Sequence, residues 1–212
     1  MSCPIKMCKG EEIANSITHA IGLGLSVAVL VLLVVWTSRY GDAWQIVSVS
    51  IFGATLVLLY LTSTLLHSYA IFRERDLLEV LDRTAIYWLI AGTYTPFMLT
   101  ALRGGWGWSI AGTVWALALF GTLFVLFSKK RFSNASCILY LLMGWLIVIA
   151  IVPAVQNLPL AGLLWLLAGG LAYSGGVFFF LSPKRFRHTL WHCAVLSGSA
   201  CHVLALVIVL QS

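Results

Sequence analysis

Residues 44–68 read WQIVSVSIFGATLVLLYLTSTLLHS, a run of 25 residues without a single Asp, Glu, Lys or Arg. A helix needs about 20 mostly apolar residues to cross the hydrocarbon core of a bilayer. The stretch is long enough for that purpose, and it therefore predicts a helical membrane protein.

Six further apolar segments accompany this one. With 61% hydrophobic and 9% charged residues, the 212-residue chain departs from soluble domains, which are about 45–50% apolar and about 25% charged. Seven spans use about 140 residues and leave about 70 for loops and ends, too few for a separate soluble domain. We therefore predict an all-α bundle of seven transmembrane helices that forms a single membrane domain over residues 1–212. The expected spans are 17–37, 44–68, 83–101, 107–128, 135–154, 158–181 and 188–210.

Basic residues gather on one side of this topology. Lys and Arg near helix ends are retained in the cytoplasm, so a cytoplasmic N-terminus and an outer C-terminus place eleven of them inside and two outside. The inner set is Lys6, Lys9, Arg73, Arg75, Arg83, Lys129, Lys130, Arg131, Lys184, Arg185 and Arg187, and the outer set is Arg39 and Arg103.

Alternating apolar and charged residues over 71–81 predict a short interfacial helix. We expect no signal peptide, because residues 1–14 lack a short apolar core followed by a cleavage site.

Charge and cysteine content narrow the possible partners. A formal net charge of +6 on a chain with few exposed residues suits anionic lipid headgroups, so we expect membrane lipids as partners and no nucleic acid. The five cysteines are odd in number and scattered, which predicts free thiols rather than a disulfide framework. They are Cys3, Cys8, Cys137, Cys193 and Cys201.

Four ionisable residues fall at one depth of the predicted bundle. Ionisable groups within spans are costly in lipid and tend to mark function. His67 closes the second span and Asp82 opens the third near the cytoplasmic face, where His188 and His192 open the last span. Their i, i+4 spacing places these last two imidazoles on one side of a helix. The charge-based topology, which makes no use of histidine, thus predicts that three imidazoles and a carboxylate converge.

This combination suits a zinc site. Zinc held by three protein ligands keeps a fourth position for water, whose pKa falls to about 7. We expect His67, His188 and His192 to be the zinc ligands, although imidazole also suits other divalent metals. Asp82 would accept a hydrogen bond from the water and move its proton. Ser63, one turn from His67, would position a substrate carbonyl.

Simpler interpretations of these side chains stay open. Asp82 could be the N-cap residue of the third helix and pair with Arg83. A membrane histidine is often only a polar contact between helices. The paired spacing of His188 and His192 favours a metal over that interpretation.

Two more histidines lie within the spans. His19 shares a helical stripe with Glu12 and Asn15, where it could support a ligand, act as a fourth ligand or only pack. His202 follows His192 by ten residues, about 15 Å along a helix, and cannot share that metal.

Several spaced motifs together resemble the hemolysin III branch of the PAQR (progestin and adipoQ receptor) family. They are Glu12-x2-Asn15-x3-His19, Ser63-x3-His67, Leu81-Asp82 with Ala85-Ile86-Tyr87-x2-Ile90-Ala91-Gly92-Thr93-Tyr94-Thr95-Pro96-Phe97, and His188-x2-Trp191-His192. The resemblance covers nearly the whole chain and implies seven helices, a cytoplasmic N-terminus, zinc on His67, His188 and His192, and a water-binding Asp82. Ser63 is the matching serine. The chain is similar in length to bacterial hemolysin III proteins, which implies a bacterial inner membrane.

Four functions are compatible with these features. The first is a zinc-dependent hydrolase of membrane lipids, for which the family's similarity to alkaline ceramidases implies an amide bond as the target. The second is a non-enzymatic membrane-homeostasis or sensor protein with a structural zinc. A cytolytic pore-former, which the family name implies, fits less well with a stable inner-membrane bundle. Haem ligation by paired histidines is the fourth.

Overall fold

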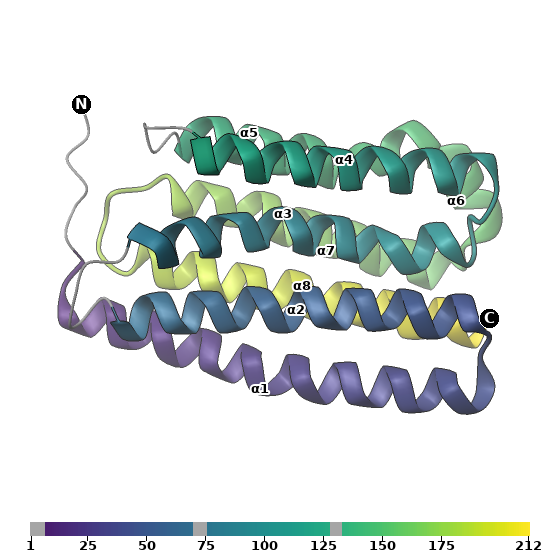
Figure 1. The fold of residues 1–212 in the computed structure, drawn as a ribbon, viewed down its shortest axis with the longest axis horizontal. Coiled ribbons are helices and arrows are strands. Elements are labelled where there is room, and N and C mark those ends of the chain that lie inside the picture. Colours follow the sequence, from purple (N-terminus) through teal and green to yellow (C-terminus); the bar gives the residue numbers. More distant parts are fainter. Residues whose placement is uncertain (1–6, 70–75, 128–132) are drawn as a thin grey trace.

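The computed structural model describes residues 7–69, 76–127 and 133–212, and these residues form helices without strands (Figure 1). The helices are α1 (Lys9–Tyr40), α2 (Ala43–Tyr69), α3 (Asp76–Leu99), α4 (Gly105–Phe127), α5 (Ser133–Gly144), the 3-10 helix η1 (Leu146–Ala150), α6 (Ile151–Asn157), α7 (Leu160–Phe180) and α8 (Arg187–Gln211). For this part of the chain the all-α prediction is confirmed.

Six helical stretches of the described chain are long and apolar enough to cross a membrane. They are α1, α2, α4, the run Asn134–Asn157, α7 and α8. Helix α3, which corresponds to the predicted span 83–101, is not among them, because Asp82, Arg83 and several Thr and Tyr lower its hydropathy. It is instead the helix with the longest buried stretch, 91–99. Seven membrane crossings and the orientation of the chain thus stay predictions.

The predicted span 135–154 is not one regular helix. Helix α5 ends at Gly144, and the chain continues through η1 before α6 begins. The break frees backbone groups that must be satisfied inside the apolar region. Tyr94 of α3 supplies the partner: its hydroxyl donates to the Gly144 carbonyl at 2.8 Å and accepts from the Ile147 N–H at 3.0 Å. A side chain from another helix therefore completes this irregular span.

The helices run lengthwise side by side, with α1 along one edge of the bundle and α4 and α5 along the opposite edge (Figure 1). Helix α3 packs against α2 and α4, and α8 packs against α7 and α1. Helix α2 ends at the same end of the bundle at which α1, α3 and α8 begin (Figure 1). The segments that carry the predicted site therefore reach one level.

Small residues bring neighbouring helices close together, as is common in membrane bundles. A Cβ atom added to Gly92 of α3 would lie 2.9 Å from the Cβ of Thr55 on α2. A Cβ added to Gly22 of α1 would lie 2.6 Å from Cδ1 of Tyr60 on α2. Both distances are below ordinary contact, so these helix pairs depend on glycine.

Some sequence predictions fall outside the described residues. They concern Cys3, Lys6, Arg73, Arg75, Lys129, Lys130 and Arg131, and residues 71–75 of the predicted interfacial helix. The described remainder of that helix, 76–81, forms the first turns of α3. It is therefore not a separate element.

Candidate metal centre

Three histidines from two helices meet at the end of the bundle. His67 lies two residues before the end of α2, and His188 and His192 lie in the first two turns of α8. One ring nitrogen from each can be chosen so that all three lie within 4.8 Å of one another. The ring centroids are 5.1 Å apart for His67 and His188, 4.9 Å for His67 and His192, and 4.7 Å for the pair on α8. The predicted convergence of these imidazoles is confirmed, and their geometry could hold a metal ion.

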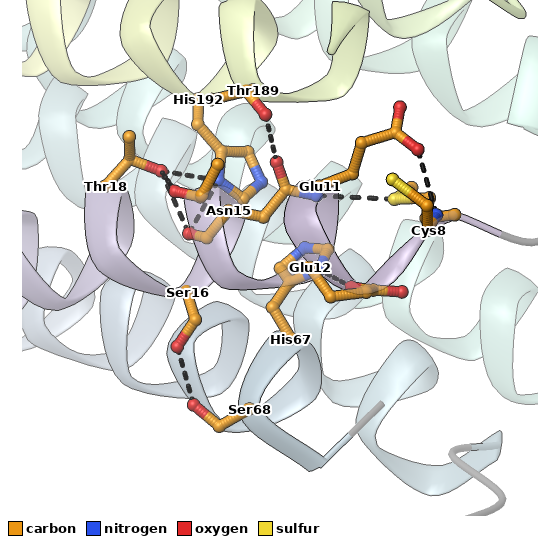
Figure 2. Close-up of polar contacts among 12 residues, drawn as sticks. Cys8, Glu11, Glu12, Asn15, Ser16, Thr18, His67, Ser68, Thr189 and His192 are labelled. Carbon is orange, nitrogen blue, oxygen red and sulfur yellow. Dashed lines mark hydrogen bonds and ion pairs between the residues drawn. The ribbon is translucent and has the colours of Figure 1, made fainter. Parts of the chain in front are cut away.

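His67 has one ring nitrogen that is available to bind a metal. The residue is 1% exposed, and its Nδ1 lies 2.6 Å from Oε2 of Glu12 on α1 (Figure 2). A carboxylate accepts, so Nδ1 carries the proton and Nε2 keeps its lone pair. This Nε2 is buried and finds no hydrogen-bond partner among the described residues. A buried imidazole with one nitrogen on a carboxylate and the other unpaired is the usual form of a metal-ligating histidine.

His192 is oriented by backbone and hydroxyl groups of α1. Its Nδ1 lies 3.2 Å from the Asn15 carbonyl oxygen and 3.2 Å from Oγ1 of Thr18. A carbonyl oxygen can only accept, so Nδ1 donates and Nε2 retains its lone pair. Two of the three imidazoles thus offer Nε2 as a ligand atom.

Asp82 and Ser63 lie beside each other near the histidines. The Ser63 hydroxyl is close enough to donate to the Asp82 carboxylate, and both residues line a cavity with His192. Asp82 lies six residues after the start of α3 at Asp76, so the N-cap interpretation of this aspartate is wrong. Asp82 is not within the three-histidine group of ligand atoms.

The cavity extends from these residues into the bundle. It has a volume of about 110 Å³ and continues past Tyr94 and Trp145 to His202. Most of its remaining walls are apolar and aromatic side chains of α3, α5, α7 and α8. An apolar cavity that ends on polar groups suits a ligand with a hydrocarbon portion.

Residues 8–203 match the sequence model of a family described as Haemolysin-III related. The chain belongs to the haemolysin-III-related family. It is 50% identical over 191 residues to the Hemolysin-3 homolog of Bacillus subtilis, with 90% of both chains covered. It is 49% identical over 191 residues to Hemolysin-3 of Bacillus cereus, with 90% of this chain and 87% of that one covered. It is also 29% identical over 204 residues to the Monocyte to macrophage differentiation factor of Homo sapiens, with 92% and 83% covered.

These matches confirm the family resemblance drawn from the spaced motifs. Together with the six apolar helices, they identify this haemolysin-III-related protein as a multi-pass protein of the inner (plasma) membrane.

His19 of the haemolysin-III-related protein stacks on His192 and is not part of the three-histidine group. The two rings are nearly parallel, 10° apart, with centroids separated by 3.5 Å. The edge of Tyr60 packs against His19 on another side, with centroids 5.1 Å apart. The stack keeps the His19 nitrogens out of the plane of the His192 ring, so the geometry favours packing over a fourth ligand.

His202 and the described cysteines lie apart from the cluster. His202 Nε2 lies 3.2 Å from the carbonyl oxygen of Leu166, farther along the bundle. The described cysteines, Cys8, Cys137, Cys193 and Cys201, are free, as predicted.

Sequence reasoning did not find the contacts that hold the ligands. The sequence places Glu12 and Asn15 on a stripe with His19 and in a family motif, but it does not show that they contact the histidines or their neighbours on α2 and α8. The hydroxyl of Thr189, which is not among the predicted site residues, donates to Oδ1 of Asn15 at 2.6 Å (Figure 2). The three- and four-residue spacing of Glu12, Asn15 and His19 was the signal for a shared face, but it did not name the helices that this face would meet.

Proposed function

We propose that this haemolysin-III-related protein binds one zinc ion through His67, His188 and His192 and hydrolyses an amide bond of a membrane lipid. The observation that supports it is the convergence of three imidazoles, with His67 Nε2 buried and unpaired, next to a carboxylate at the end of an apolar cavity. Three nitrogen ligands with one open position are typical of catalytic rather than structural zinc sites.

The donor set fits the metal. Two of the imidazoles have Nδ1 held by an acceptor, which leaves Nε2 free to coordinate. When bound, zinc lowers the pKa of water to about 7 and polarises a carbonyl oxygen.

Residues of the protein itself would transfer the proton, orient the catalytic carboxylate and bind the lipid. Asp82 would accept the proton of the attacking water and pass it to the leaving nitrogen, a role that needs a carboxylate beside the cluster. Ser63, which lines the same cavity, would orient Asp82 by donating a hydrogen bond to its carboxylate. The apolar walls would take the hydrocarbon portion of the lipid and exclude water.

A structural or sensing role for zinc is the second candidate. The cluster joins the end of α2 to the start of α8, and metal binding there would tie the two helices together. Haem fits less well, because the rings of His67 and His192, with centroids 4.9 Å apart, leave no room for a porphyrin between them.

Metal analysis of the purified protein and its variants tests the proposal. We expect one zinc per chain in the wild-type protein and its loss from His67→Ala and His188→Ala. His202→Ala is the matched control, since it removes a histidine of α8 outside the cluster and should keep the zinc. Zinc retained by both cluster variants would disprove the site.

Mass spectrometry of lipids incubated with the same proteins tests the hydrolysis. Wild-type protein should release fatty acid from an amide-linked lipid such as a ceramide, and His67→Ala should not. Bound zinc without any change in the lipids would favour the structural or sensing role.

A further inference from the structure

The first turns of α1 contact both helices that carry the histidines. Glu12 reaches His67 on α2 with 2.6 Å between Oε2 and Nδ1. One turn later, the side chain of Asn15 accepts from Thr189 on α8 at 2.6 Å, while its carbonyl oxygen lies 3.2 Å from His192 Nδ1 (Figure 2). Residues three apart face the same side of a helix, so one stripe of α1 touches α2 and α8 at the cluster.

The same end of α1 also contacts the turn that precedes α8. Oε1 of Glu11 accepts from the Phe186 N–H at 2.7 Å, and Phe186 is the residue immediately before the helix, with φ of 58°. His188 is the second residue of α8, so its position depends on where this turn holds the start of the helix. Glu11 thereby links α1 to the first turn that carries a histidine.

Charge gives Glu12 a role that a neutral acceptor would not have. Three neutral imidazoles leave both charges of a divalent cation uncompensated, which is costly in a medium of low dielectric constant. The Glu12 side chain is buried, with 3% of the residue exposed, and lies directly behind a histidine of the cluster. It would bring a negative charge close to a site that takes two positive ones.

We propose that Glu12 is a positioning residue that sets the affinity of the three-histidine cluster for zinc, by holding His67 with Nε2 toward the metal and by balancing its charge. Asn15 holds His192 in the same way, with Nε2 toward the metal. The proposal rests on the zinc site of the proposed function, and it assigns the Glu12-x2-Asn15 motif to metal affinity.

Zinc competition against a chromophoric chelator measures this role in the full-length protein in detergent. Glu12→Gln keeps an acceptor for His67 but removes the charge, whereas Glu12→Ala removes both. Loss of a partner behind a metal ligand typically weakens affinity by about 10–100-fold. We expect Glu12→Gln near the lower end of this range and Glu12→Ala near the upper end. Asp42→Asn is the matched control: it also removes one negative charge, but at the cap of α2 at the far end of the bundle.

Two further measurements separate positioning from a general loss of fold. The visible absorption spectrum of the cobalt-loaded protein reports ligand geometry, and we expect it to change in Glu12→Ala and to stay unchanged in Asp42→Asn. The melting temperature of metal-free Glu12→Gln should stay close to that of the metal-free wild type, since the hydrogen bond to His67 is kept.

The outcomes are distinct. Wild-type zinc affinity in both Glu12 variants, with zinc lost from His67→Ala, would overturn the role of Glu12 and leave the zinc site intact. A weakened affinity with an unchanged cobalt spectrum in Glu12→Ala would overturn the positioning role. A wild-type protein that binds no zinc would overturn the proposed function together with this inference.

Discussion

The hydroxyl group of Tyr94 on α3 donates to the carbonyl of Gly144, the last residue of α5, at 2.8 Å. The same oxygen accepts from the N–H of Ile147 at 3.0 Å, so it bridges the point where α5 gives way to η1. Tyr94 also lines the cavity that leads from the histidine cluster. The broken helix and the wall of the candidate site are thus held by one side chain.

Tyr94→Phe should lower the stability of the protein while preserving its fold. The substitution leaves the Gly144 carbonyl and the Ile147 N–H without their partner in an apolar environment. We expect a loss of about 1–2 kcal/mol, the range for hydrogen bonds between membrane helices. Thermal unfolding in detergent measures it. Tyr40→Phe, an exposed tyrosine at the end of α1, is the control, and an equal loss in both variants would argue against the bridge.

Gly92→Ala should destabilise the contact between α2 and α3. The new methyl group would lie 2.9 Å from Cβ of Thr55, so the two helices would have to move apart. Overpacking of this kind costs about 1–3 kcal/mol. Gly112→Ala in α4 is the matched control, because a Cβ there meets nothing within 4 Å. The melting temperatures of the two variants are compared with that of the wild type. A wild-type melting temperature in Gly92→Ala would show that the α2–α3 contact tolerates a side chain.

The histidine cluster could be predicted because it depends on topology. Charge placement and span lengths bring His67 and His188 to one end of the bundle, although more than a hundred residues separate them. Helical periodicity then aligns His192 with His188. No knowledge of side-chain packing is needed for this step, so the prediction is robust to errors of several residues in the span boundaries.

The contacts around the cluster could not be predicted in this way. Span order does not tell which helices lie side by side, so it does not predict that α1 contacts both α2 and α8, nor that Glu12 meets His67. Likewise, residues 135–154 form a nearly uniform apolar run, and the end of α5 at Gly144 depends on Tyr94, fifty residues earlier. The interpretation of Asp82 as the N-cap residue of the third helix is wrong because α3 begins at Asp76, before the apolar part of the segment.

Removal of zinc should destabilise the protein if the three histidines bind it. A ligand at 100 times its dissociation constant stabilises the native state by about 2.7 kcal/mol. For a chain of this size, that corresponds to about 5–10 °C in melting temperature. We expect the wild-type protein to melt lower after chelation and to recover when zinc is added. His67→Ala should show no response to either treatment, and a response equal to that of the wild type would place the metal elsewhere.

Asp82→Asn should separate zinc binding from hydrolysis. The amide keeps an oxygen that can accept from Ser63, so the local structure should persist and zinc should stay bound. It cannot take up a proton, and the loss of a general acid or base typically lowers a rate by about 10²–10⁴-fold. Release of fatty acid from an amide-linked lipid, followed by mass spectrometry, measures the rate. Asp76→Asn, at the start of α3, is the control for charge and should retain activity.

Ser63→Ala tests whether the hydroxyl acts through Asp82 or independently of it. In the structure the Ser63 hydroxyl is close enough to donate to the Asp82 carboxylate, and residues that act as a unit show effects that do not add. We therefore expect Ser63→Ala to slow hydrolysis on its own but to cause little further loss in the Asp82→Asn background. Zinc content, measured in parallel, should be equal in all three variants. If the two effects on the rate simply add, Ser63 contacts the substrate by itself, and its hydrogen bond to Asp82 is not what the reaction requires.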